Sequence, residues 1–535
     1  MKNQIKCIDK TLLVPIIFYI MANVFMLFMN GLWWDDWVYL SPDKGHVREL
    51  YQENGGYASL YVYNLFNSVA NWNILPYLYR ALSFLTGFFL LIISYFLLNQ
   101  YSLKKNEIFY ILLLVSTSPL FSTKITMVCG LYGCLSLFFY IGCYFFNKYL
   151  FERRICYRLL SLILFLVSLF IWYQAILAIP CFVVLSIILL SDKKYNCSIW
   201  GNILKYLDFL IIPLFFWIIR SLFLMPQNNH ADYYKVSFAS LGNAILPSIQ
   251  FFIQSIADYF YNIFSLYNSS LYFILFLILG SIVYFIGKSL NNEEVKASRR
   301  YSRWIILLPL LISLSAVLPS LLIGRGLPCI LSVNSRFQSL YLLPFSVTIY
   351  FAINLICSSE KIRRILLSCL LAGSFLSSIS ILLDYQKSWF KAVEVSRIIA
   401  KEEALNTQGN NIIFNDLCRH LNYYPRSDWA PYELTGISKM ALNGDETHNY
   451  INIHEYDQYV NERKIGIEYN VRECANLYQF DYIFSLSDNR ILSSSQIIYL
   501  TYLYYVNYDK FKTCLDTFFK YNLIELDSFE FYNQL

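Results

Sequence analysis

Charged residues are scarce in this chain: 15% of its 535 residues are Asp, Glu, Lys or Arg, whereas 57% are hydrophobic. This composition excludes an ordinary soluble globular protein. Strands of alternating polarity are absent from residues 1–383, which excludes a transmembrane β-barrel. No CxxC spacing occurs among the thirteen cysteines, so neither a cysteine zinc site nor a redox pair is predicted. The net charge of +6 is not gathered in one basic stretch, and we expect no nucleic-acid partner.

Long apolar segments dominate the first part of the chain. Segments of about 18 to 22 apolar residues recur there, each long enough to cross a hydrocarbon core of about 30 Å as a helix. We therefore predict an all-α polytopic membrane bundle over residues 1–383. The predicted crossings lie near 11–32, 77–98, 107–123, 128–147, 157–173, 175–191, 206–225, 270–287, 304–323, 339–358 and 365–383. The amphipathic stretch 241–267 is too polar for a crossing and is interpreted as a helix in the membrane interface.

The character of the chain changes at Asp384. A charged helix is predicted over Tyr385–Leu405, and short strands are predicted at Asn411–Phe414 and Tyr482–Ser485. Residues 384–535 are therefore expected to form a small soluble α/β domain.

Lys and Arg mark one side of the membrane. They are concentrated in alternate loops, starting with Lys2, Lys6 and Lys10 at the N-terminus. Because loops rich in Lys and Arg stay in the cytoplasm, the N-terminus is predicted to be cytoplasmic. Eleven crossings then place the first long loop and the C-terminal domain outside. The expected location is the cytoplasmic (inner) membrane, with membrane lipid as a partner.

The first external loop opens with Trp33, Trp34, Asp35, Asp36 and Trp37. Trp rings favour the headgroup level, so the sequence predicts an acidic pair held at the membrane boundary inside an indole belt. The alternative is a solvated start to an external loop. Two neighbouring carboxylates also suit Mg²⁺ or Mn²⁺, but consecutive side chains point apart and further ligands are lacking. No metal or other cofactor is predicted.

Cations are predicted at the outer ends of several crossings. They are Arg325, Arg336, Lys124 and Arg80. Arg336 is the first choice for holding a phosphate, because a guanidinium pairs with phosphate oxygens through a planar fork. The alternative for Arg336 and Arg325 is an interfacial anchor that reaches the lipid headgroups. Tyr173 and Gln174 are predicted to face the protein interior, to bind a sugar hydroxyl or to form an interhelical hydrogen bond.

These residue types suit transfer from an activated sugar phosphate. A phosphate leaves without being protonated, so the reaction needs one carboxylate to deprotonate the acceptor hydroxyl and cations to hold the departing phosphate. Asp36 is the preferred base because it lies farther past the membrane end than Asp35.

The layout resembles the GT-C class of glycosyltransferases, which use polyprenyl-phosphate sugars. The acidic pair and the triplet Tyr173, Gln174 and Ala175 are similar to the serotype-converting glucosyltransferases that decorate bacterial O-antigen. The resemblance implies a hexosyltransferase that moves a sugar, glucose being the first choice, from a polyprenyl-phosphate donor to a cell-surface glycan or lipid-linked glycan by inverting displacement. In that group a basic residue would follow the acidic pair closely, whereas here the next cation is Lys44.

Two other functions stay open at this point. A polysaccharide polymerase of the O-antigen type would have large Arg-rich loops late in the chain, whereas loop 324–338 is short. A lipid-linked glycan transporter or flippase would have ionisable residues at the midplane of several crossings, and Arg220 is nearly alone there.

Overall fold

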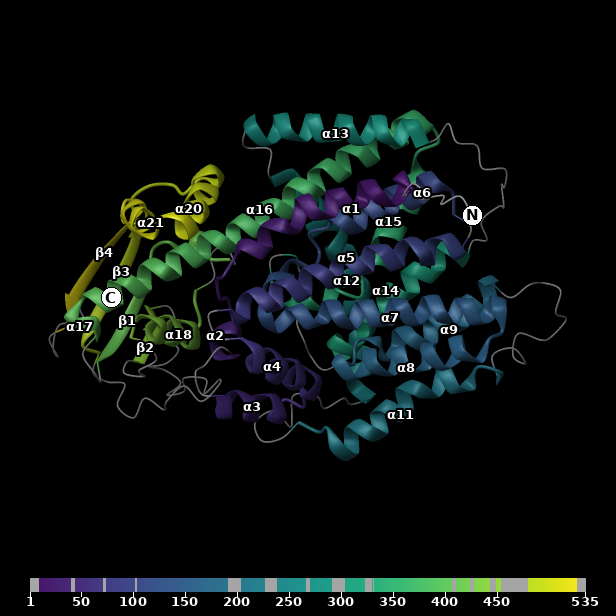
Figure 1. The fold of residues 1–535 in the computed structure, drawn as a ribbon, viewed down its shortest axis with the longest axis horizontal. Coiled ribbons are helices and arrows are strands. Elements are labelled where there is room, and N and C mark those ends of the chain that lie inside the picture. The colour runs from purple at the N-terminus through teal and green to yellow at the C-terminus, as the bar shows by residue number, and fades with distance from the viewer. Residues whose placement is uncertain are drawn as a thin grey trace, which may run out of the picture. The chain divides into compact units, whose positions relative to one another are not determined.

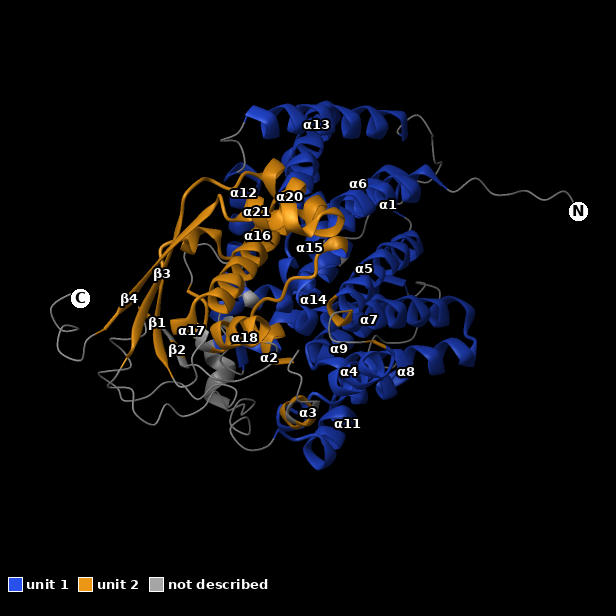
Figure 2. Cartoon of the chain, turned by 60° about the vertical axis from the view of Figure 1, so that its left-hand side comes forward, with its two compact units in different colours: residues 1–27, 51–69, 77–379 blue, residues 28–50, 70–76, 380–535 orange. Residues whose placement is uncertain are grey.

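A computed structural model describes residues 9–39, 44–70, 74–101, 103–190, 204–226, 238–265, 270–290, 304–322, 330, 332–406, 410–423, 428–442, 449–453 and 480–526. The chain forms two compact units, coloured separately in Figure 2. Unit 1 comprises residues 1–27, 51–69 and 77–379, and unit 2 comprises residues 28–50, 70–76 and 380–535. The division after residue 379 lies close to the domain boundary predicted after 383. The loop with the acidic pair, however, belongs to the same unit as the C-terminal residues.

Helices make up most of the described chain (Figure 1). In the first half they are α1 (Lys10–Asn23), η1 (Val24–Phe28), α2 (Asp36–Tyr39), α3 (Lys44–Glu53), α4 (Tyr57–Val69), α5 (Leu75–Gln100), α6 (Lys105–Thr117), η2 (Ser122–Ile125), α7 (Met127–Glu152), α8 (Ile155–Ile171), α9 (Ala175–Leu190), α11 (Leu207–Phe223) and α12 (Phe238–Ser265). They continue with α13 (Ser270–Leu290), α14 (Trp304–Leu322), η5 (Val333–Gln338), α15 (Leu342–Ile356), α16 (Glu360–Lys401), α17 (Glu403–Asn406), η6 (Arg419–Leu421), α18 (Pro431–Ala441), α20 (Ser494–Val506) and α21 (Tyr508–Leu515).

Every segment predicted to cross the membrane lies on one or more of these helices. In the described part of the chain, five helical segments are long and apolar enough to cross a membrane on their own: Lys10–Phe28, α5, α7, α13 and α16. Helix α13 also exposes large apolar side chains such as Leu271, Phe273 and Phe285, which lipid would cover. The chain is a membrane protein. Eleven crossings stay a prediction, since α6, for example, has 13 residues and is only about 20 Å long.

The small sheet of unit 2 has the strand order β2-β1-β3-β4. Strand β1 (Asn411–Asp416) pairs in parallel with β2 (Asn449–Asn452) and with β3 (Tyr482–Asp488), and β3 pairs antiparallel with β4 (Phe519–Glu525). The predicted strands at 411–414 and 482–485 are thus confirmed and slightly extended. The centre of β1 is fully buried, as its run of β-branched and aromatic residues predicts.

Helix α16 joins two segments that the sequence analysis treated separately. The crossing predicted at 365–383 and the charged helix predicted from Tyr385 form one continuous helix of 42 residues. Its C-terminal half packs in unit 2, where Phe390 lies 5.3 Å from Phe511 between ring centroids. The fully buried Lys391 forms an ion pair with Asp416 at the end of β1, with Nζ and Oδ2 2.5 Å apart. This buried cation therefore has a carboxylate partner, as buried charges require.

Gly436 of α18 permits a close contact within unit 2. A Cβ atom at this position would lie 2.8 Å from the Cβ atom of Trp37. We predict that Gly436→Ala lowers the free energy of unfolding of unit 2 by about 1–3 kcal/mol, because the indole or the helix must move. Gly280→Ala in α13 is the matched control, since its nearest neighbour would lie 3.8 Å away. Equal thermal unfolding midpoints for the two variants would contradict this packing.

Candidate functional site

The acidic pair sits in a tight backbone turn that leads into α2. Trp34 has a φ of 54°, the left-handed region that costs a non-glycine residue about 1–2 kcal/mol. The N–H of Asp36 donates to the carbonyl of Trp33 at 3.2 Å, and α2 begins at Asp36. The turn therefore fixes the direction in which both carboxylates leave the backbone.

Both carboxylates are buried in unit 2. Asp36 is fully buried, and Asp35 has 5% of its surface exposed. The hydroxyl of Tyr432 donates to Asp35 Oδ1 at 3.3 Å, and the backbone N–H of Trp33 lies 3.4 Å from Asp36 Oδ2. The alternative of a solvated acidic loop is therefore wrong for these two residues.

The indoles around the pair face protein. Trp33 and Trp37 are 1% and 8% exposed. The Trp33 ring packs edge-on against Tyr385 at 5.2 Å and its Nε1 donates to the Tyr385 carbonyl, while Trp37 lies 6.0 Å from Trp389. The interpretation of a lipid-facing indole belt is therefore wrong for Trp33 and Trp37, because α16 supplies partners that local sequence does not reveal.

Glu433 at the start of α18 holds the turn of the acidic pair. Its Oε1 accepts from the backbone N–H of Trp34 at 2.9 Å and from the Tyr423 hydroxyl at 3.0 Å. Its Oε2 accepts from the N–H of Ala430 at 3.0 Å. Burial raises the pKa of Glu433 to about 7, although these three donors act in the opposite direction. Sequence reasoning missed Glu433, which is about 400 positions from the turn that it binds.

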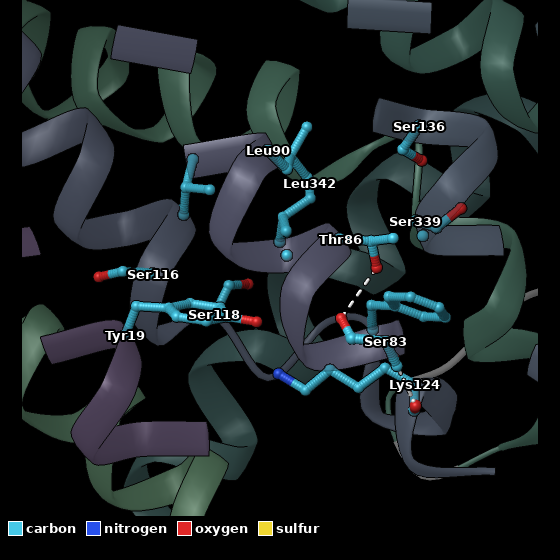
Figure 3. A pocket seen from close by; sticks show the side chains of 14 residues that line it. Tyr19, Ser83, Thr86, Leu90, Ser116, Ser118, Lys124, Ser136, Ser339 and Leu342 are labelled. Atoms are coloured by element: carbon cyan, nitrogen blue, oxygen red, sulfur yellow. Dashed lines mark hydrogen bonds between the residues drawn. The ribbon is translucent and has the colours of Figure 1, made fainter. Parts of the chain in front are cut away.

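Unit 1 contains a cavity whose lining combines apolar side chains with several hydroxyl groups and one lysine (Figure 3). Its cavity volume is about 40 Å³. The hydroxyl-bearing lining residues are Tyr19, Ser83, Thr86, Ser116, Ser118, Ser136 and Ser339. Figure 3 shows the Lys124 side chain extended along this cavity. The Ser339 Oγ atom is buried and has no hydrogen-bond partner in the described part of the chain. This hydroxyl can therefore still form a hydrogen bond with a ligand.

The ammonium of Lys124 has an unusual set of partners. Its Nζ donates to Asn23 Oδ1 at 2.5 Å, and no carboxylate within the described ranges forms an ion pair with it. Burial lowers the pKa of Lys124 from 10.5 to about 8. Lys391 of unit 2 is fully buried, whereas Lys124 is only partly buried, and Lys391 has Asp416 beside it. Lys124 is thus a partly buried cation that forms no ion pair with a described carboxylate, which suits an anionic ligand.

Hydrogen bonds connect the Lys124 turn to Arg80 and to η5. Arg80 is fully buried, and its Nε donates to the carbonyl of Ile125 at 3.2 Å. Ser335 Oγ lies 2.9 Å from Ser122 Oγ and accepts from the N–H of Thr123 at 3.1 Å. Two of the predicted cations, Arg80 and Lys124, therefore lie on directly bonded segments, and Arg336 follows Ser335 in the third.

Aromatic contacts relate Arg336 to the other predicted binding residues. The Arg336 guanidinium lies over the ring of Phe337, which contacts Tyr132 at 6.3 Å. Trp172 contacts Tyr132 at 5.2 Å and Tyr173 at 5.1 Å. This series of rings runs from η5 to the turn between α8 and α9, where the Arg220 guanidinium covers the Tyr173 ring at 5.2 Å.

Gln174 follows Tyr173 in the chain, and its side chain is fully buried. Neither its Oε1 nor its Nε2 has a hydrogen-bond partner among the residues that the structure describes. The predicted interior-facing position is confirmed, and an interhelical hydrogen bond, the alternative for Gln174, is not observed among those residues. A ligand hydroxyl can satisfy such a buried amide.

The remaining predicted cation, Arg325, lies outside the described residues. Within the ranges that are described, no group of three or more His, Cys, Asp or Glu side chains is arranged to hold a metal ion. Sequence reasoning also missed Asn23, which is a polar residue near the end of the first apolar segment. A polar residue on a hydrophobic helix usually forms a hydrogen bond inside the protein, so the position of Asn23 could have indicated such a contact.

No protein-family model matches the chain, and no curated protein is similar to it in sequence.

Proposed function

We propose that the chain is a membrane glycosyltransferase that uses a polyprenyl-phosphate sugar and modifies a cell-surface glycan at the outer face of the cytoplasmic membrane. The observation that carries the proposal is the cavity beside Lys124, whose partly buried ammonium has no carboxylate partner among the described residues and whose lining includes several hydroxyl groups. A donor phosphodiester carries one negative charge and several acceptor oxygens, which match this cation and the surrounding hydroxyl groups.

The proposed reaction is a single displacement. The acceptor hydroxyl oxygen attacks the anomeric carbon of the donor sugar, and the bond from that carbon to the phosphate oxygen breaks. Asp36 takes the proton of the acceptor hydroxyl, and the lipid phosphate leaves as an anion that Lys124 stabilises. Inversion at the anomeric carbon follows from one displacement. Arg80 and Arg336 support the negative charge, and Tyr173 and Gln174 contact sugar hydroxyl groups.

Purified full-length chain in proteoliposomes tests the proposal. Polyprenyl-phosphate glucose labelled in the sugar is the first donor, and surface glycan from the native host is the acceptor. The proposal predicts labelled glycan and free polyprenyl phosphate in equal amounts. A chain that leaves every polyprenyl-phosphate hexose unchanged in the presence of that glycan would contradict it.

Donor affinity should depend on the protonation of Lys124. Its folded pKa of about 8 lies below the ordinary 10.5, so the charged form is disfavoured and the amine becomes neutral as the pH rises through 8. The donor phosphodiester keeps its charge over this range. We predict affinity for polyprenyl-phosphate glucose about tenfold lower at pH 9 than at pH 7, measured by equilibrium binding. Lys124→Arg should bind equally at both pH values, and a wild-type profile as flat as that of this variant would contradict the assignment.

A further inference from the structure

One face of α18 contacts the turn that carries the acidic pair. Tyr432, Glu433 and Gly436 lie on neighbouring positions of the helix, and each contacts the loop of residues 34–37. Tyr432 bonds the Asp35 carboxylate, Glu433 bonds the Trp34 backbone, and Gly436 lies against the Trp37 ring. Residues three and four apart share one side of a helix, so these contacts form a single docking surface within unit 2.

Glu433 bonds the residue of the turn whose backbone conformation is the least favourable, Trp34. Trp34 has the left-handed backbone conformation, and its N–H donates to Glu433 Oε1. Strained conformations persist where surrounding structure over-determines them. The same carboxylate is itself held by Tyr423 and Ala430, so it is a fixed acceptor.

We infer that α18 positions the acidic pair for catalysis, with Glu433 and Tyr432 as positioning residues that act through Trp34 and Asp35. This inference rests on the proposed function of Asp36. A general base must lie within hydrogen-bond reach of the proton that it removes, and misplacement by about 1 Å can cost about a hundredfold in rate. The C-terminal domain is therefore part of the catalytic machinery.

Glu433→Gln in the full chain tests the inference. A glutamine has one acceptor oxygen for the three donors that Glu433 binds, so at least one bond is lost. We expect kcat to fall about 10- to 100-fold, with the KM for polyprenyl-phosphate glucose within twofold of wild type. Amide hydrogen exchange across residues 33–39 should become at least about tenfold faster. Glu525→Gln is the matched control, because Glu525 is an exposed residue of β4, and it should change neither quantity.

A second variant separates positioning from general support of the fold. Glycine adopts a positive φ without strain, so Trp34→Gly combined with Glu433→Gln should recover part of the kcat lost in Glu433→Gln alone. Tyr432→Phe should lower kcat by about threefold. Recovery supports the inference, and a double variant as slow as Glu433→Gln overturns it.

Hydrogen exchange needs no substrate and distinguishes the two possible failures. Unchanged exchange at 33–39 in Glu433→Gln would overturn the inference, whatever the activity. A wild-type chain that transfers no sugar would defeat the proposed function, while faster exchange in the variant would still support the structural part of the inference.

Discussion

Replacing Asp36 with Asn should abolish sugar transfer while leaving membrane insertion and folding intact. The amide cannot accept the proton of the acceptor hydroxyl, and loss of a general base typically costs 10²- to 10⁴-fold in rate. Asn has nearly the same shape and keeps an oxygen near the Trp33 N–H, which lies 3.4 Å from Asp36 Oδ2 in the native protein. We therefore expect a transfer rate at least about 100-fold lower, with an unchanged thermal unfolding midpoint.

Two further Asp→Asn variants give this test its controls. Asp384→Asn carries the same chemical change in unit 2, where Asp384 forms a partly exposed ion pair with Lys387, and it should transfer at the wild-type rate. Asp35→Asn should lose less than Asp36→Asn, because Asp35 accepts from Tyr432 and is interpreted as the supporting member of the pair. Full activity of the Asp36 variant would remove its assignment as the base.

Replacing Lys124 with Met should weaken donor use and stabilise the protein at the same time. The activity falls because the donor phosphate loses its cation, and we expect kcat/KM for the donor to drop about 100-fold, equivalent to about 3 kcal/mol. The stability rises because a partly buried ammonium without a carboxylate partner in the described chain is replaced by an apolar side chain of similar length.

The stability gain has a defined size and pH dependence. A lysine pKa lowered from 10.5 to about 8 means that the folded state disfavours the charged form by about 3 kcal/mol, less the hydrogen bond lost at Asn23. Without donor, the gain in Lys124→Met should be largest below pH 8 and should shrink as the pH rises from 8 to 10.5. Lys288→Met, at an exposed position of α13, should change neither activity nor stability. A destabilised Lys124→Met with normal donor kinetics would show that the lysine is only structural.

Local sequence was enough for much of the secondary structure. Apolar runs predicted where the helices lie, and short β-branched segments predicted β1 and β3, because both patterns depend on neighbours a few residues away. The continuous α16 was missed, since the change from apolar to charged residues near 384 resembles a domain boundary. No proline interrupts the helix there. Strands β2 and β4 were missed because Asn449–Asn452 and Phe519–Glu525 mix polar with apolar residues, and their strand structure depends on pairing within the sheet.

For the candidate site, too, local sequence predicts residue types but not tertiary contacts. Residue types and loop position led to Asp36, Lys124 and Gln174 as candidates, and their roles stay a prediction. Their surroundings were not predictable. Glu433 bonds Trp34 across about 400 residues, and whether a described carboxylate lies beside Lys124 depends on the tertiary structure. Because tertiary contacts are not visible in the sequence, Trp33 and Trp37 were predicted to face the lipid headgroups. Sequence identifies such indoles as amphipathic, but only the folded chain shows that α16 covers them.

A structure of the Asp36→Asn variant bound to polyprenyl-phosphate glucose tests the central claim most directly. The account predicts the donor phosphate within hydrogen-bond distance of Lys124 Nζ. A donor whose phosphate lies away from Lys124 would contradict it.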